Sequence, residues 1–201
     1  MSKVLYIKAN AKDEGQSRTF KISDSFIEEY KKLNPNDEII TLDLYQEGIT
    51  ELPVGQLSEL HAPAPGTGRD NPILKYAYQF LEADKYVFAE PFWNLSIPAI
   101  LKSYIDYITV TGITFKYTAE GPVGLCVGKK VVNIVSRGGD YSVEPMASFE
   151  MGDRYLRTIL GFLGATDYTT IAANGLDVIG NDVDAIINNA ITKAKEVAQT
   201  F

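Results

Sequence analysis

The sequence predicts an α/β protein with a parallel sheet covered by helices on both faces. Short apolar runs rich in β-branched and aromatic residues alternate with helical patterns along the 201 residues. These runs are apolar almost throughout, instead of at every second position, which is typical of strands buried on both faces. The length and the apolar content of 45% favour a single domain over residues 1–201.

The expected elements can be placed along the chain. Five strands are expected, at residues 4–7, 38–42, 86–90, 130–136 and 167–172. Helical periodicity indicates helices at about 17–33, 72–83, 98–110, 149–163 and 182–199, and the segment TFKYT reads as a small hairpin arm. Residues 45–70 are rich in Pro and Gly, and a loop of that length in a compact domain is usually functional. Five such strands predict a doubly wound, flavodoxin-like sheet, in which ligands bind beyond the carboxyl ends of the strands.

The composition excludes several classes of function. A formal net charge of −7 makes the protein a poor general binder of nucleic acid or of an anionic membrane. The single cysteine, Cys126, allows no intrachain disulfide, and the single histidine, His61, allows no multi-histidine metal site. The N-terminal segment soon turns polar, unlike a signal peptide, and no apolar run approaches the roughly 20 residues of a spanning helix. A cytoplasmic protein without a bound metal is therefore expected.

Three loops should meet at one edge of the sheet, because they follow the first, third and fourth strands. The first ends in Ser17, Arg18 and Thr19 at a helix start, where free amides and the helix dipole attract anions. Ser17 has the alternative role of an N-cap alone. No Gly-x-Gly-x-x-Gly follows the first strand, and GPVGLCVGKK does not have the P-loop spacing. A mononucleotide phosphate remains compatible with this loop.

The second and third loops carry residue types that suit a flat ring. The segment from Phe92 to Leu95 offers apolar flanks and an amide that can read a ring edge. Alternatively, it forms a hydrophobic turn with Trp93 in the core. The segment from Ser136 to Gly139 has paired glycines, which allow close backbone approach and unusual backbone angles, although a simple turn has the same composition. The placement of all three loops after neighbouring strands is what points to a ligand site.

Four stretches of the chain have the pattern of a known family. They are the start MSKVLYIKA, the segment PFWNLSIPAILKSYIDYI, the block GITFKYTAEGPVGL-x-x-GKK, and the SRGG loop with the later FLG. Through them, nearly the whole chain resembles the bacterial FMN-dependent NADH:azoreductase family, which is related to the NAD(P)H:quinone reductases. Asn10 stands where many relatives have serine, and Arg18 lies between the hydroxyl residues of the family's Ser-x-Ser pattern. The resemblance implies FMN contacts at Asn10, Ser17, Arg18, Thr19, Phe92, Trp93, Asn94, Leu95, Ser136, Arg137, Gly138 and Gly139.

The resemblance also implies a ping-pong reaction. A reduced nicotinamide, NADH or NADPH, passes hydride to N5 of the flavin and leaves, and a quinone or an azo compound then takes two electrons in the same place. Phe115, in the hairpin arm, is the candidate that caps this stack, with packing on its own domain as the alternative. Tyr141 stands where some relatives have histidine; it can donate a hydrogen bond but brings no positive charge. Charge on the flavin should then be balanced by the Gly138 and Gly139 amides with Arg137.

A homodimer with the active site at its interface is expected, because relatives complete the substrate pocket from both subunits. The apolar run at 97–108, with Tyr104 and Tyr107, exceeds what one helix face needs in a monomer. Two other functions remain open: a flavodoxin-like one-electron carrier, which the acidity suits, and a structural dimer that has lost its flavin. The loop at 45–70 and the hairpin arm favour an enzyme, because a carrier needs no substrate pocket.

Overall fold

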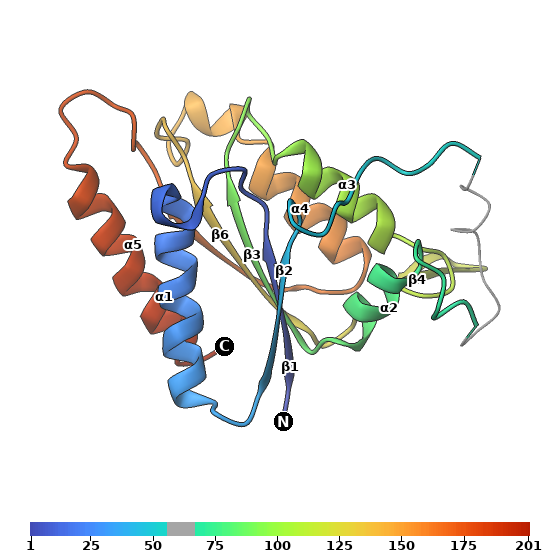
Figure 1. The fold of residues 1–201 in the computed structure, drawn as a ribbon. Helices are drawn as coiled ribbons and strands as arrows, with labels where there is room; N and C mark the ends of the chain where they lie inside the picture. The colour runs from blue at the N-terminus through green and yellow to red at the C-terminus, as the bar shows by residue number, and fades with distance from the viewer. Residues whose placement is uncertain (56–66) are drawn as a thin grey trace.

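The central feature of the molecule is a five-stranded parallel sheet (Figure 1). The computed structural model describes residues 1–55 and 67–201, so His61 and the middle of the loop at 45–70 lie outside the described residues. The strand order is β2-β1-β3-β6-β7, with every neighbouring pair parallel, which confirms the predicted fold class. The strands are β1 Lys3–Lys8, β2 Glu38–Asp43, β3 Lys85–Pro91, β6 Lys130–Ser136 and β7 Asp167–Ala173.

Helices cover both faces of this sheet (Figure 1). Helices α1 (Arg18–Leu33) and α5 (Val183–Ala198) pack side by side on one face. The other face carries α2 (Lys75–Glu82), α3 (Ala99–Ile108) and α4 (Gly152–Phe162). Alternate residues of β1 serve the two layers, since Val4 packs with α1 and α5 while Leu5 packs with the opposite layer. This double burial is the reason why the strand sequences are apolar throughout.

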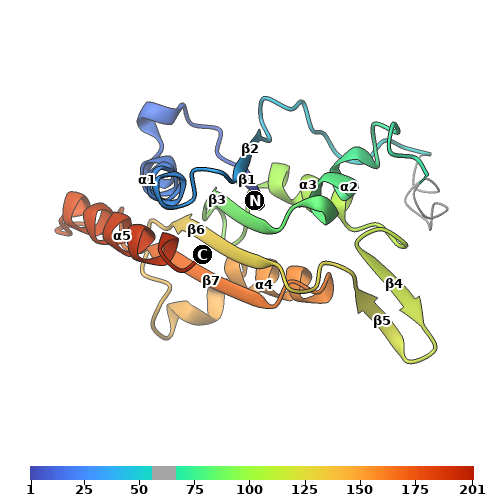
Figure 2. The same cartoon turned by 90° about the horizontal axis from the view of Figure 1, so that it is seen from below.

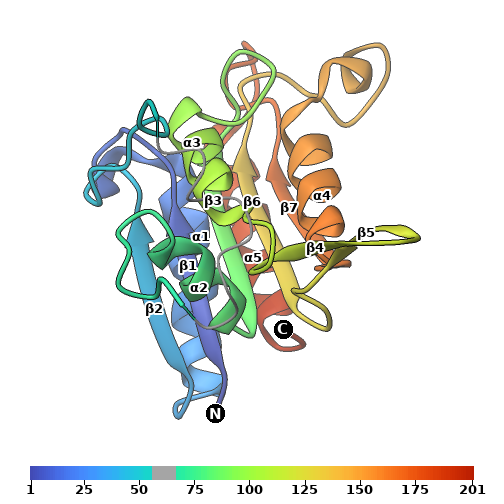
Figure 3. The same cartoon turned by 90° about the vertical axis from the view of Figure 1, so that its right-hand side faces the viewer.

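A two-stranded arm projects from the sheet (Figures 2 and 3). Strand β4 (Phe115–Thr118) pairs antiparallel with β5 (Gly121–Gly124), which confirms the predicted hairpin. The base of the arm touches the end of α4 so closely that a side-chain carbon at Gly124 would collide with the backbone of Leu163. Glycine at this position therefore fixes where the arm leaves the domain.

Two helices begin three residues later than the sequence pattern predicts. Helix α2 begins at Lys75 because Asn71 first closes a turn, accepting from the amide of Ile73 through its side chain and from that of Leu74 through its carbonyl. Helix α4 begins at Gly152 because the Glu150 side chain caps it from outside, accepting from three successive amides. Both corrections come from side chains that satisfy backbone groups at a helix start.

The apolar run at 97–108 packs against other parts of the same chain. Tyr104 is fully buried and Tyr107 is nearly so, and both rings meet the ring of Tyr76 edge to face. The inference that this run exceeds the needs of a monomer is therefore wrong, while the dimer itself stays a prediction.

Across residues 1–55 and 67–201, no helix is long and apolar enough to cross a membrane.

Candidate active site

A polar cleft lies at the carboxyl ends of the strands, where the fold predicts it. It brings together the three loops after β1, β3 and β6, together with the loop after β7. Seven of the residues predicted from the sequence line it: Asn10, Arg18, Phe92, Trp93, Ser136, Arg137 and Gly138. Four more were not predicted: Lys12, Pro91, Leu176 and Asp177. Lys12 had a signal, as a basic residue in the first loop, whereas nothing in the sequence singles out the loop after β7.

The first loop ends at the helix start as a pre-formed anion site. Ser17 is the N-cap of α1, and its hydroxyl oxygen accepts from the Phe20 amide at 3.1 Å and from Asn10 Nδ2 at 2.8 Å. The amides of Arg18 and Thr19 have no acceptor within the helix. The capping role considered for Ser17 is therefore real, and it leaves two backbone donors and the dipole end of a 16-residue helix pointing toward the cleft.

Charged side chains flank this anion site. Arg18 Nη1 lies 2.6 Å from Asp177 Oδ1 and 3.3 Å from the carbonyl oxygen of Leu176. Thr19 does not line the cleft; its hydroxyl is hydrogen-bonded to the Ser136 hydroxyl at 2.6 Å and ties the first loop to the third. Lys12 adds a second cation on the cleft wall. The lining of the cleft therefore includes two cations, Arg18 and Lys12, and one carboxylate, Asp177, beside the start of α1.

The second loop supplies the aromatic wall. Phe92 is buried, and Trp93 is 37% exposed on the cleft, so the alternative of a core tryptophan is wrong. Asn94 and Leu95 have φ of 50° and 68°, in the left-handed region that side chains rarely adopt. A turn closed by mutual backbone hydrogen bonds between Trp93 and Ser96 holds this conformation. Such local strain is typical of ligand-binding loops.

The third loop uses its glycines for close packing of loops. Neither Gly138 nor Gly139 has a positive φ, so the expected unusual backbone angles are absent at these two residues. A side-chain carbon at Gly138 would instead lie 2.6 Å from Asp177 Oδ2, and one at Gly139 would lie 3.1 Å from the Tyr141 ring. The Asp177 amide donates to the Gly138 carbonyl at 2.9 Å. The absence of side chains therefore lets this loop join the loop after β7.

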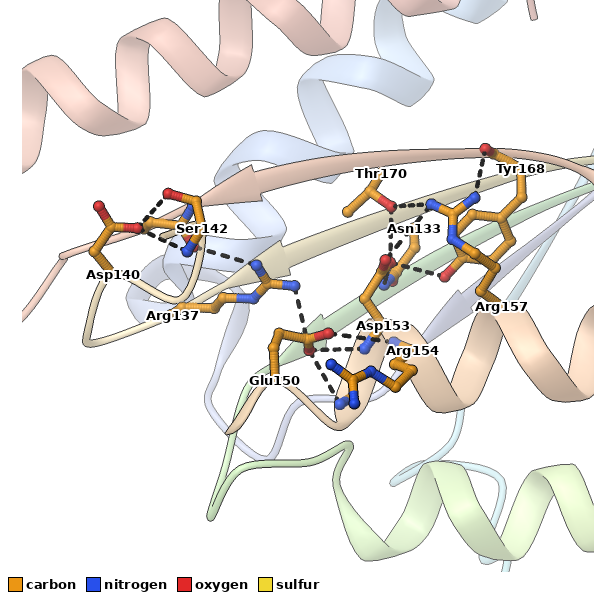
Figure 4. Close-up of polar contacts among 12 residues, drawn as sticks. Asn133, Arg137, Asp140, Ser142, Glu150, Asp153, Arg154, Arg157, Tyr168 and Thr170 are labelled. Carbon is orange, nitrogen blue, oxygen red and sulfur yellow. Dashed lines mark hydrogen bonds and ion pairs between the residues drawn. The ribbon is translucent and has the colours of Figure 1, made fainter. Parts of the chain in front are cut away.

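Arg137 lies between the cleft and the protein interior. Its side chain is buried, with Nη2 3.3 Å from Glu150 Oε1 and the guanidinium carbon 5.6 Å from the centre of the Phe92 ring. Arg137 is therefore not a solvated side chain: its ion pair with Glu150 (Figure 4) and its contact with the Phe92 ring fix it beside the cleft. Tyr141 also packs against Phe92, with its ring centre 4.6 Å from that of Phe92.

Phe115 does not join these residues in the chain. It is buried at the base of the arm, where its ring contacts those of Tyr117 and Phe162, and it does not line the cleft. These contacts agree with its alternative role, packing on its own domain. A role of Phe115 in capping a ligand stays a prediction.

The cleft suits FMN in its shape and donor set. A helix start with free amides and two cations matches a terminal phosphate dianion. Phe92 and Trp93 match the flat faces of a ring, and backbone groups of the third loop match its polar edge. A left-handed backbone at two successive residues with side chains is a further mark of a ligand-shaped loop.

Comparison with known proteins places the chain in a family. Residues 2–198 match the model of a family described as having a flavodoxin-like fold. FMN-dependent NADH:quinone oxidoreductase 2 of Clostridium acetobutylicum is 71% identical over 201 residues, covering all of both chains. The corresponding enzyme of Caldicellulosiruptor saccharolyticus is 59% identical over the same full length.

Solved structures agree with this placement. An azoreductase from Bacillus anthracis superimposes with a TM-score of 0.89 and 38% identity, covering all of both chains. An FMN-dependent NADH-azoreductase from Bacillus anthracis, solved in complex with FMN, has a TM-score of 0.89 and 30% identity, covering 100% of this chain and 99% of that one. The chain therefore belongs to the flavodoxin-like family of FMN-dependent NADH:quinone oxidoreductases and azoreductases.

Proposed function

We infer that the protein is an FMN-dependent NADH:quinone oxidoreductase that also reduces aromatic azo compounds. The observation that carries this conclusion is the cleft, which combines an anion site at the start of α1 with an aromatic wall at Phe92 and Trp93. Full-length identity of 71% to an enzyme of that name supports the same reaction. When bound, FMN would supply the redox chemistry that connects NADH to a two-electron acceptor.

The protein's own contribution is to bind and orient. The amides of Arg18 and Thr19, with the side chains of Arg18 and Lys12, hold the phosphate. Phe92 and Trp93 form the apolar wall for the ring, and Asn94 offers polar atoms to its edge. Buried Arg137 places a fixed positive charge beside the ring site, where charge accumulates on electron uptake. Exposed Trp93 leaves this wall open to a flat substrate.

We also propose that the protein is a homodimer whose active sites lie at the interface. The loops beside the cleft expose a group of large apolar side chains, and the Met151 amide donates to the Leu95 carbonyl to join the two loops. Exposed apolar side chains grouped in neighbouring loops are typical of an association surface, and two-fold pairing is its commonest form. The members of the patch are Trp93, Leu95, Val143, Met146, Phe149 and Met151. A monomeric mass by light scattering with full activity would contradict this proposal.

A cytoplasmic location fits the same function. Cys126 is a free, buried thiol, as is usual in a reducing compartment. NADH, the donor in the names of the relatives, is the donor proposed here.

Addition of NADH to the purified protein under nitrogen tests the function. Rapid, complete bleaching of a yellow protein, followed by return of colour on adding a quinone, is expected of the enzyme. Slow or absent bleaching would indicate the one-electron carrier, and a colourless protein that does not bind added FMN would indicate the structural dimer.

A further inference from the structure

A carboxyl group lies fully buried directly behind the cleft. Glu90 belongs to β3 and precedes Pro91 and Phe92, which line the cleft. Its exposure is 0%, and neither carboxyl oxygen has a hydrogen-bond partner among the described residues. An ionised carboxylate without a donor in such a place is very unfavourable, because burial removes its hydration.

The register of the sheet places Glu90 between two polar neighbours. Glu90 is opposite Val135 of β6, so it shares a face with Asn133 and Arg137, two residues to either side of Val135. Asn133 is also fully buried, and its Oδ1 has no partner among the described residues. Two unpaired acceptors, the Glu90 carboxyl and Asn133 Oδ1, therefore occupy one buried region.

The orientation of the Asn133 amide is fixed from the other side. Asn133 Nδ2 donates to Asp153 Oδ1 at 3.0 Å, and the Tyr168 and Thr170 hydroxyls donate to the same oxygen (Figure 4). Turning the amide would put its oxygen against this carboxylate. Asn133 therefore presents an acceptor, and only a donor can satisfy it.

The other carboxylates of the cluster have cationic and hydrogen-bonding partners. Asp153 Oδ2 lies 3.6 Å from Arg157 Nη2. Glu150 caps α4 through three amides and pairs with Arg137. Arg137 is the cation that acts on Glu90; its Nη atoms are shared with Glu150 and with Asn174 Oδ1 at 3.4 Å, and its Nε has no partner among the described residues.

These contacts decide the protonation of Glu90. Burial raises its pKa well above the ordinary value, the charges of Asp153 and Glu150 add to the rise, and the charge of Arg137 opposes it; Asn133 Nδ2, which donates to Asp153, makes no hydrogen bond to either Glu90 oxygen. A proton on Glu90 removes the buried charge and converts one of its oxygens into a donor for Asn133 Oδ1, which pairs two of the three unpaired oxygens.

We propose that Glu90 is a positioning residue of the FMN site: it is a neutral acid that donates to Asn133 and, by carrying no charge, leaves the Arg137 guanidinium positive toward the cleft. The consequence for FMN rests on the proposed function, whereas the protonation of Glu90 does not. An ionised Glu90 would compete for Arg137 from behind and weaken the field that Arg137 projects onto the ring site.

Infrared spectroscopy tests the protonation directly. Protein labelled with ¹³C-glutamate is compared with Glu90→Gln at neutral pH, and the wild type should show the C=O stretch of one protonated carboxyl that the variant lacks. Glu120→Gln, at an exposed turn, is the matched control and should keep this band. Identical spectra of the wild type and Glu90→Gln would overturn the proposal, whether or not the protein binds FMN.

A double-mutant cycle on FMN affinity tests the link to Arg137. Arg137→Gln should weaken FMN binding by the same factor, within about twofold, in the wild type and in the Glu90→Gln background, because neutral Glu90 and Gln are equivalent toward Arg137. A clearly smaller loss in the wild-type background would show that an ionised Glu90 neutralises Arg137, and would overturn the proposal. If the unmodified protein does not bind FMN, the proposed function is refuted. The infrared result would still decide the protonation of Glu90, because it does not depend on FMN.

Discussion

Arg18 Nη1 lies 2.6 Å from Asp177 Oδ1, so an ion pair joins the start of α1 to the loop after β7 at the end of the cleft proposed to bind the FMN phosphate. The pair is exposed to solvent on both sides, with side-chain exposures of 39% and 70%. Asp177 neutralises the cation that the phosphate needs, and it is itself a negative charge beside the phosphate site. The pair is therefore expected to be exchanged for a phosphate contact when FMN binds.

Replacement of Asp177 by Asn is expected to tighten FMN binding. The gain should be about two- to fivefold, because an exposed ion pair is worth up to about 1 kcal/mol. The effect should shrink at high salt, where exposed charges are screened. Quenching of FMN fluorescence by the apoprotein, at two salt concentrations, measures the FMN affinity. Arg18→Gln, which removes the cation of the pair, should instead weaken FMN binding. Weaker binding by the Asp177→Asn variant would show that Asp177 supports the site.

Removal of the Ser17 hydroxyl should affect both stability and FMN binding. Ser17→Ala should cost about 1 kcal/mol of unfolding free energy, as N-caps do. FMN affinity should fall by about tenfold or more, because the amides that face the phosphate lose their support and a charged hydrogen bond is worth about 1.5–3 kcal/mol. The matched control is Asp182→Ala, which removes the N-cap of α5, where Asp182 accepts from the Ala185 amide at 3.0 Å.

The two cap variants separate folding from binding. Asp182→Ala should lose similar stability in urea unfolding and keep the FMN affinity of the wild type, since α5 begins away from the cleft-lining residues. Equal losses of FMN affinity in both variants would mean that Ser17 acts only through general stability.

The architecture followed from the sequence because double burial of strands leaves a strong pattern. Five strands, the hairpin arm and the three converging loops were all predictable from apolar runs and turn residues. Asp177 was not, because its role depends on β7 lying beside β6, a tertiary relationship without a local signal. Glu90 had a signal, as a charged residue inside an apolar strand, but its partners Asn133 and Asp153 come together only through the sheet register and α4.

Tyr104 shows how the same pattern can mislead. The apolar surface of α3, which carries Tyr104, is wider than one helix face usually needs, and this suggested an interface between subunits. Tyr76 of α2 covers this surface within the chain. The apolar residues exposed beside the cleft lie in loops, where no periodicity marks them.

A bulky side chain at Gly139 should abolish FMN binding without unfolding the protein. A single carbon there would already lie 3.1 Å from the Tyr141 ring, so Gly139→Leu must displace Tyr141 and the loop against the aromatic wall. Gly161→Leu is the matched control, because space around Gly161 is open. Recovery of stoichiometric FMN with folded Gly139→Leu protein would show that this loop does not approach the flavin.

The pH response of Asp140 reports the order of the third loop. The Ser142 hydroxyl and amide donate to its carboxylate and hold its pKa below the ordinary value. Because the pKa of Asp140 is lowered in the folded state, its ionised carboxylate stabilises the turn at pH values above the ordinary pKa of the group. This stabilisation is lost as the pH falls through the folded-state pKa. Ser142→Ala should therefore raise the pKa of Asp140, followed by NMR of the carboxyl carbon, while Ser148→Ala, in the next turn, should leave it unchanged. An unchanged pKa in Ser142→Ala would refute the hydroxyl contact.

The last prediction concerns Tyr141, whose ring contributes more than its hydroxyl. The ring centre lies 4.6 Å from that of Phe92, at an interplanar angle of 58°, and supports the wall of the cleft. Arg137, buried against the same Phe92 ring, already supplies the positive charge that Tyr141 lacks. Tyr141→Phe should therefore change turnover with NADH and a quinone by less than about threefold, the effect of a typical neutral hydrogen bond of roughly 0.5 kcal/mol. Tyr141→Ala should weaken FMN binding more strongly, because Phe92 loses its packing partner. A loss of well over a hundredfold in turnover for Tyr141→Phe, with FMN retained, would instead identify the hydroxyl as an essential proton donor. The proton would then come from this side chain and not from solvent or substrate.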